Sequence, residues 1–267
     1  MPSDFEMIIH RFPEGRDITI IPIADVHLGS EECMEQKFIS FIGTLAEKPD
    51  VYVCLLGDLL DNGTRNGITN VFRALDPPSV QKRMMAKILE PIRDKILFCL
   101  DGNHERRSGK DADDSPCYDI MAKLDLEHLY RENVAFVKIQ FGEQESESGT
   151  RTNGSRRPCY TIVGMHGAGG GALTGASVNR NERMAYAIDN MDCMIVGHSH
   201  RPVITQPGKI YIDTRNNQVT VKPFKVVTAT SWLSWGGYSA QKQLTPTTNA
   251  PQTLTLRGDR KEMVVTM

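Results

Sequence analysis

The chain has 267 residues, of which 40 % are hydrophobic, and its formal net charge is −2. A globule of this size buries roughly three quarters of its unfolded surface, which excludes the small folds that depend on disulfides or a structural metal. The near-neutral charge does not predict a polyanion-binding protein, although it leaves room for a local basic patch.

Short apolar runs rich in β-branched residues predict strands along the whole chain. They cover residues 18–24, 51–56, 96–100, 134–141, 159–165, 193–196, 203–206, 209–212, 219–228, 253–256 and 263–265. Apolar residues at helical spacing predict helices over residues 35–47, 79–92, 118–130 and 181–189. Two long polar stretches, 143–157 and 238–251, predict loops.

Strand and helix thus alternate over the first two thirds of the chain, and hairpins dominate from about residue 201 to 267. No linker divides the chain. We therefore expect one domain over residues 1–267, of the α/β class, with two packed mixed β-sheets flanked by helices.

Five short polar blocks each follow an apolar run, at the predicted end of a strand. They are Asp25-Val26-His27, Gly57-Asp58-Leu59-Leu60-Asp61-Asn62, Gly102-Asn103-His104-Glu105, Met165-His166-Gly167 and Gly197-His198-Ser199-His200. Carboxylate and amide oxygens suit hard divalent cations, and imidazole suits borderline ones. Strand ends hold ligands on a rigid scaffold around a shared cleft. The five blocks together therefore predict a metal centre and a hydrolase.

In order and spacing the blocks resemble the calcineurin-like metallophosphoesterase superfamily, whose motifs are D-x-H, G-D-x-x-D, G-N-H-[E/D], H and G-H-x-H. The resemblance runs from Asp25 to His200 and includes all five motifs. It implies a four-layer α/β/β/α sandwich and a phosphoester hydrolase with two divalent metal ions. Manganese is the first expectation for these ions, with Fe, Zn, Ni or Mg as alternatives.

The resemblance also implies a role for each block residue. The first ion would be held by Asp25, His27, Asp58 and His200, and the second by Asp58, Asn103, His166 and His198. Asp58 would bridge both ions, and a hydroxide between them would attack phosphorus. His104 would bind a phosphoryl oxygen or protonate the leaving group. The Asp61 carboxylate would orient His104 by accepting its other ring N–H.

The residue after Asp61 bears on the substrate. Ser/Thr protein phosphatases of the superfamily carry an arginine there and lack the paired G-H-x-H motif, whereas this chain has Asn62 and the His198–His200 pair. The chain therefore resembles the phosphodiesterase and nuclease branch, including small bacterial and phage phosphoesterases, and a nucleotide or nucleic acid is the expected substrate. Six arginines near the blocks are candidates for phosphate contacts. These are Arg65, Arg106, Arg107, Arg180, Arg183 and Arg201.

Two other functions stay open. One is a phosphomonoesterase, including a protein phosphatase, and the other is a metal-binding scaffold without catalysis, against which the complete set of ligands argues. His10 and His128 lie outside the blocks, and we expect them to be surface or hydrogen-bonded core histidines. The sequence predicts no oligomeric state.

The cysteines and the apolar runs bear on the compartment. The six cysteines form no C-x-x-C pair, and Cys54, Cys99 and Cys193 lie in apolar runs, where cysteine behaves as a small hydrophobic residue. The N-terminal stretch lacks the apolar segment of a signal peptide, and no apolar run approaches the roughly 20 residues of a membrane helix. We expect free thiols, no membrane partner and a cytoplasmic location, in the host if the gene is phage-encoded.

Overall fold

The computed structural model describes residues 2–64, 74–142, 157–169 and 173–267. Two six-stranded sheets and a separate two-stranded hairpin make up the β-structure of these residues. The first sheet has the order β14-β13-β2-β3-β4-β5. Its strands are β2 (Ile18–Ile23), β3 (Val51–Leu55), β4 (Ile96–Leu100), β5 (Tyr130–Arg131), β13 (Thr253–Leu256) and β14 (Met263–Thr266). The central strands β2 to β5 are parallel, and β13 and β14 complete one edge as antiparallel strands.

The second sheet has the order β1-β6-β7-β8-β12-β9 and is also mixed. Its strands are β1 (Ile8–Phe12), β6 (Val134–Phe141), β7 (Cys159–Met165), β8 (Cys193–Val196), β9 (Val203–Thr205) and β12 (Lys225–Thr228). The parallel strands β7, β8 and β12 bring the loops that follow them to one edge of the sheet.

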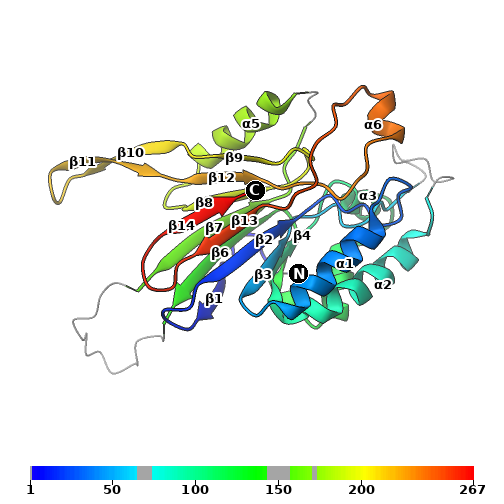
Figure 1. The fold of residues 1–267 in the computed structure, drawn as a ribbon, viewed down its shortest axis with the longest axis horizontal. Coiled ribbons are helices and arrows are strands. Elements are labelled where there is room, and N and C mark those ends of the chain that lie inside the picture. Colours follow the sequence, from blue (N-terminus) through cyan, green and yellow to red (C-terminus); the bar gives the residue numbers. More distant parts are fainter. Residues whose placement is uncertain (1, 65–73, 143–156, 170–172) are drawn as a thin grey trace.

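The two sheets pack face to face, and one large cluster of buried side chains, including Ile20, Phe98 and Ile139, draws residues from both. Helices cover the outer faces (Figure 1). On the side of the first sheet they are α1 (Glu35–Glu47), α2 (Pro78–Leu89), α4 (Pro116–Lys123) and the short 3₁₀ helices Glu90–Lys95 and Glu127–Leu129. A smaller buried cluster that includes Met194 and Val226 lies on the outer face of the second sheet, where α5 (Thr174–Tyr186) packs. The predicted architecture of two mixed sheets flanked by helices is confirmed.

The sequence-based prediction is wrong for several elements. The 219–228 run is two strands, because β11 (Gln218–Pro223) ends before β12 begins. The strands β1 and β5 and the helices α3 (Glu105–Ala112) and α6 (Gly237–Gln241) are not predicted, since they are short or lack an apolar stripe. The predicted loop 238–251 contains part of α6, and the predicted loop 143–157 lies almost wholly outside the described residues.

Helix α5 shows why the pattern failed there. It begins at Thr174, seven residues before the predicted start, and the side chains that it buries are Ser177, Asn181 and Ala185. These small residues follow one another at a spacing of four, so they form a helical stripe that is not apolar. The Asn181 amide donates a hydrogen bond to the Thr228 hydroxyl in β12 (3.2 Å).

Among the described helices, none has both the length and the apolar character that a membrane span requires.

Candidate metal centre

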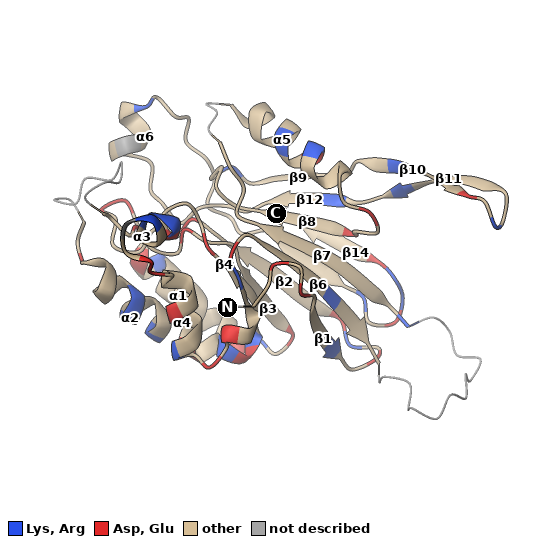
Figure 2. Cartoon of the chain, turned by 180° about the vertical axis from the view of Figure 1, so that it is seen from behind, with Lys and Arg blue, Asp and Glu red and all other residues tan. Residues whose placement is uncertain are grey.

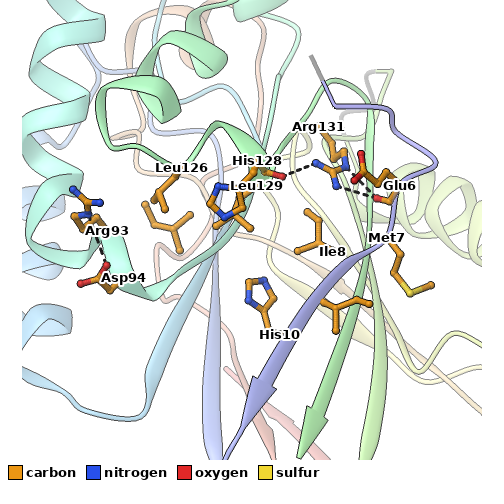
Figure 3. A pocket seen from close by; sticks show the side chains of 12 residues that line it. Glu6, Met7, Ile8, His10, Arg93, Asp94, Leu126, His128, Leu129 and Arg131 are labelled. Carbon is orange, nitrogen blue, oxygen red and sulfur yellow. Dashed lines mark hydrogen bonds and ion pairs between the residues drawn. The ribbon is translucent and has the colours of Figure 1, made fainter. Parts of the chain in front are cut away.

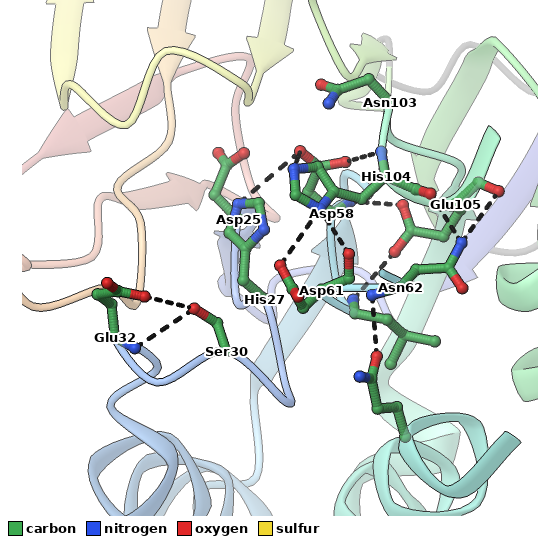
Figure 4. Close-up of polar contacts among 12 residues, drawn as sticks. Asp25, His27, Ser30, Glu32, Asp58, Asp61, Asn62, Asn103, His104 and Glu105 are labelled. Atoms are coloured by element: carbon green, nitrogen blue, oxygen red, sulfur yellow. Dashed lines mark hydrogen bonds and ion pairs between the residues drawn. The ribbon is translucent and has the colours of Figure 1, made fainter. Parts of the chain in front are cut away.

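All five polar blocks begin within three residues of a strand end, and their loops meet where the two sheets come together. Asp25 follows β2, Asp58 follows β3 and Asn103 follows β4 in the first sheet, and His166 and His198 follow β7 and β8 in the second. Because parallel strands present their carboxyl ends at the same edge, the loops converge from both sheets. Figure 4 shows Asp25, His27, Asp58 and His104 facing one another in this region.

The backbone of these loops has an unusual conformation that the sequence does not reveal. Five of the seven predicted ligands have positive φ angles: Asp25 (54°), His27 (51°), Asp58 (49°), His198 (66°) and His200 (56°). Asp and His adopt this left-handed region more readily than most residues, but each such residue still costs on the order of 1–3 kcal/mol. Clusters of such residues are typical of functional sites, where the surrounding fold holds side chains in place.

The first group of candidate ligands comprises Asp25, His27 and His200. The Nε2 atom of His200 lies 3.3 Å from Asp25 Oδ1 and 3.4 Å from His27 Nε2. Asp25 Oδ1 is fully buried and accepts no hydrogen bond from any described residue. A buried carboxylate oxygen without a donor, facing two imidazole nitrogens, is a donor set that fits a divalent cation.

The second group comprises Asp58, His166 and His198, and Asn103 adjoins it. His166 Nε2 lies 3.4 Å from Asp58 Oδ2 and 3.0 Å from the Asn103 side-chain oxygen. The other ring nitrogen, His166 Nδ1, donates to the Leu56 carbonyl (2.7 Å). In neutral imidazole this leaves the Nε2 lone pair facing the centre, as metal coordination requires.

Asp58 lies between the two groups. Its Oδ2 atom is 3.8 Å from His27 Nε2 in the first group and 3.4 Å from His166 Nε2 in the second. Its Oδ1 atom accepts the backbone N–H of His104 (2.8 Å), which fixes the carboxylate. The two groups are further tied together because the His198 backbone N–H donates to Asp25 Oδ2 (2.8 Å). The geometry suits a carboxylate shared by two cations.

The electrostatics of the centre follow from several acidic and imidazole groups buried together. Burial lowers the pKa of His166, but the Asp58 carboxylate raises it by more, to about 9. Burial and the neighbouring His104 hold the pKa of His27 well below its usual value. Burial alone would raise the pKa of Asp58, but His166, His104 and His27 lower it well below the ordinary range. A cation at Nε2 of His166 would displace its proton, so metal binding should release protons.

Glu105 anchors two of the three ligand loops of the first sheet, those after β3 and β4, a role that the sequence did not reveal. Its fully buried carboxylate accepts the backbone N–H groups of Asp58 and Gly102 (both 2.9 Å) and of Leu60 (3.0 Å) (Figure 4). Burial raises the pKa of Glu105 to about 8, and the Asp58 charge adds to that rise. Three N–H donors aimed at the carboxylate favour its ionised form.

These two loops approach so closely that both need glycine. A Cβ atom on Gly57, whose φ is +85°, would lie 2.2 Å from the Gly102 nitrogen. A Cβ atom on Gly102 would lie 2.1 Å from Asp58 Oδ1. The glycines in the G-D-x-x-D and G-N-H-E blocks therefore let the bridging carboxylate sit directly against the neighbouring loop.

His104 is oriented by Asp61, though not through the atom that we predicted. Its Nδ1 atom donates to the Asp61 backbone carbonyl (2.7 Å), whereas the Asp61 Oδ1 atom is 3.6 Å away, too far for a hydrogen bond. His104 Nε2 therefore faces the centre, 3.9 Å from Asp58 Oδ2. Burial raises the pKa of the Asp61 carboxyl, while His104 and Arg107 partly oppose that rise.

The candidate phosphate-binding arginines divide into two sets. Lys and Arg gather on α3, as Figure 2 shows, and the charge of Arg107 on this helix acts on Asp61. Arg201 directly follows His200 and donates to the Thr245 hydroxyl (2.9 Å). Arg180 donates to the carbonyls of Ala168 and Gly169, in the loop after His166. These three arginines lie in or against the loops of the centre.

The other three arginines are not placed at the centre. Arg106 donates to the carbonyls of Asp101 (3.2 Å) and Glu132 (3.4 Å), so it connects α3 to the end of β5. Arg183 is exposed on α5. Arg65 lies outside the described residues.

A cavity of about 450 Å³ lies at the other end of β4, away from the metal centre (Figure 3). His10 and His128 line it. His10 Nε2 donates to the Leu97 carbonyl (2.8 Å), and burial lowers its pKa. Arg131 in the same wall donates to the carbonyls of Glu6 and His128. His10 is thus half-buried and hydrogen-bonded to the backbone, which agrees with the expectation of a surface or hydrogen-bonded core histidine.

One protein-family model covers the region that holds the five polar blocks. The model of the calcineurin-like phosphoesterase family matches residues 18–202. No curated protein sequence matches the chain. Two solved structures, each 12 % identical with a TM-score of 0.38 over 94 % of this chain, are among its structural neighbours. They are a predicted phosphoesterase from Streptococcus pneumoniae, covered over 99 % of its length, and a metallophosphoesterase from Sphaerobacter thermophilus, covered over 89 %.

The family match spans more than half of the chain and contains all five polar blocks. The chain therefore belongs to the calcineurin-like phosphoesterase family and is a metal-dependent phosphoester hydrolase.

Proposed function

We propose that the protein is a two-metal phosphodiesterase that acts on a nucleotide or nucleic acid. The observation that carries this proposal is the position of Asp58 between two clusters of carboxylate and imidazole groups. One ion would be held by Asp25, His27, Asp58 and His200, and the other by Asp58, Asn103, His166 and His198. The mixture of carboxylate, amide and imidazole donors supports manganese as the first choice of metal.

When bound, the two cations would neutralise phosphoryl oxygens and lower the pKa of an attacking water. Protonation of the leaving group and positioning of the bridging carboxylate would come from residues of this chain. His104 donates its Nδ1–H to the Asp61 carbonyl, so the imidazolium form of the ring carries a second proton on Nε2, which it can give to the leaving oxygen as it returns to neutral imidazole. Glu105 and the glycines keep Asp58 in the position that both ions need.

The environment of Asn62 supports a diester rather than a monoester substrate. Monoester-cleaving protein phosphatases carry a clamp arginine at this position, and such a side chain has to reach the substrate. Asn62 is instead fully buried, and its amide donates to the His104 carbonyl (2.7 Å) and the Ser108 hydroxyl (2.8 Å). Arg107, Arg180 and Arg201 remain as contacts for the flanking phosphates of a nucleic acid.

The six cysteines are all free thiols, which supports a reducing compartment such as the cytoplasm as the place of action.

The proposed phosphodiesterase activity is tested with manganese-reconstituted protein on matched substrates. We expect kcat/KM for bis-nitrophenyl phosphate to exceed that for nitrophenyl phosphate by about tenfold or more, a difference of roughly 1.4 kcal/mol in transition-state binding. Single-stranded DNA, duplex DNA and cyclic nucleotides then define the natural class.

Preference for the monoester would replace this proposal with a phosphomonoesterase. A protein that binds two equivalents of manganese and cleaves none of these substrates would favour the non-catalytic scaffold.

A further inference from the structure

The hairpin of β10 (Gly208–Asp213) and β11 (Gln218–Pro223) extends away from both large sheets (Figure 1). Its register pairs Ile210 with Val221 and Ile212 with Val219, so these four side chains share one face. They are 75 %, 69 %, 67 % and 68 % exposed, respectively. Contiguous apolar surface of this kind is uncommon on soluble monomers and marks an interaction site.

The other face of the hairpin is polar and already has contacts. It carries Lys209, Tyr211, Thr220 and Lys222, and the Lys222 ammonium lies 3.1 Å from the centre of the Tyr211 ring. Lys209 Nζ lies 3.3 Å from Asp189, just beyond the end of α5. The hairpin is therefore amphipathic, with one face adapted to solvent and the other to burial.

The apolar face of the hairpin is turned away from the α5 side of the second sheet. Val227 in β12 belongs to the cluster between the two sheets, whereas Phe224 and Val226 belong to the cluster on the outer, α5 side. Lys209, on the polar face, contacts the Phe224 ring and donates to the Ile188 carbonyl, so the polar face is turned towards the α5 side and the face of Val219 and Val221 away from it. The hairpin thus continues the inner face of the second sheet beyond the region where the first sheet covers it.

We propose that this face is covered by the same hairpin of a second copy, in a two-fold symmetric dimer. Two apolar ribbons would then pack face to face, as the two sheets do within the chain. A symmetric interface needs a self-complementary surface. The four β-branched side chains meet that need, since none is charged and the same rows face each other after a two-fold rotation.

The area agrees with a dimer. Four aliphatic side chains, each about two-thirds exposed or more, offer roughly 500 Å² per copy, so their complete burial in two copies would cover up to about 1,000 Å², which reaches the minimum for a specific interface. An isolated two-stranded ribbon is at best marginally stable in water, so the second layer would also stabilise the hairpin. The hairpin begins after β9, at the end of that strand farther from His200, so such a dimer leaves the metal centre open.

The test is the mass of the full chain in solution, measured by sedimentation equilibrium and light scattering. We expect twice the chain mass of 29.8 kDa for the wild type at micromolar concentrations. Val221→Lys places a charge in the centre of the apolar face and should raise the dimer dissociation constant by about 100-fold or more, the effect of losing an interface hot spot. Thr220→Lys adds the same charge on the opposite face and should leave the dimer intact.

Both positions are exposed, so circular dichroism melting should show both variants folded. A wild type that stays at 29.8 kDa up to roughly 100 µM would overturn the proposal, and so would equal effects of the two substitutions. A monomeric wild type that cosediments with phosphatidylcholine vesicles, while Val221→Lys does not, would also overturn it and assign the face to a lipid surface.

Discussion

Histidines gather in two regions of this molecule, and only one of the two has the character of a metal centre. At the carboxyl end of β4, imidazole nitrogens face each other and buried carboxylates, and Asp25 Oδ1 has no donor among the described residues. In the cavity lined by His10 and His128, His10 is bonded to the Leu97 carbonyl, and Arg131 to the carbonyls of Glu6 and His128. A cluster of histidines alone therefore does not indicate a cation site. The indication is a buried carboxylate oxygen that has no hydrogen-bond donor and faces imidazole nitrogens.

This contrast between the two histidine regions predicts that Asp58, whose carboxylate lies between the two groups of candidate ligands, is the position most sensitive to substitution. Asp58→Asn should weaken both sites together, because one side chain serves both groups, and should reduce turnover by more than the roughly 10⁴-fold that loss of a general acid costs. Metal content and kcat measured on the same preparation provide the test. A variant that keeps two equivalents of metal and the wild-type rate would remove Asp58 from this role. Asp192 precedes β8, at the end of that strand opposite to His198, so Asp192→Asn is the matched control remote from the centre.

His104 should matter for chemistry without mattering for metal content. If it protonates the leaving oxygen, His104→Ala should lose about 10²–10⁴-fold on a nucleotide diester, whose alkoxide needs a proton. The loss should be far smaller on bis-nitrophenyl phosphate, because nitrophenolate leaves without one. Equal losses on both substrates would assign His104 to binding of a phosphoryl oxygen, and loss of metal would make it a ligand.

Glu105 should have an intermediate effect, exerted through the loops that it joins. In Glu105→Gln the amide keeps one acceptor and turns an NH₂ group towards backbone N–H donors, so at least one buried donor loses its partner at about 1–3 kcal/mol. Metal affinity should fall about 10- to 100-fold. Titration with Mn²⁺ and urea unfolding measure the two effects, with the exposed Glu47→Gln as control. Unchanged affinity would show that the anchor is dispensable.

The smallest effect is expected in the cavity at the other end of the sheet. Burial lowers the pKa of His10, so the folded state disfavours the imidazolium and the unfolded state binds more protons below its pKa of about 6.5. The stability of the wild type should therefore fall as the pH drops through this window. His10→Gln keeps a donor for Leu97 without a titrating group and should flatten that fall. Urea unfolding of metal-free protein at pH 5 and pH 7.5 measures it, and an unchanged slope would contradict it.

The convergence of the five polar blocks could be predicted because it follows from chain order, while the ligand roles of their residues stay a prediction. Each block directly follows a strand, and parallel strands bring such positions to one edge. The backbone contacts could not be predicted in this way. Glu105 acts on N–H groups 45 and 47 residues away, and the His104 partner is a carbonyl rather than the expected carboxylate. Such contacts depend on loop conformation, which the side-chain pattern does not specify.

The helices likewise differ in how well the sequence predicts them. Helix α1 has the predicted bounds, because Phe38, Ile42 and Leu45 form an apolar stripe. Helix α5 begins earlier than predicted, because its packing uses small polar side chains instead. The single domain over residues 1–267 stays a prediction.

The proposed position of the Asp58 carboxylate between two cation sites can be checked by Mn²⁺ titration of metal-free protein followed by electron paramagnetic resonance. We expect two equivalents bound per chain and the spectrum of a spin-coupled manganese pair, since a shared carboxylate would hold the ions close together. Binding of a single equivalent, or of two equivalents with the spectra of isolated ions, would contradict it.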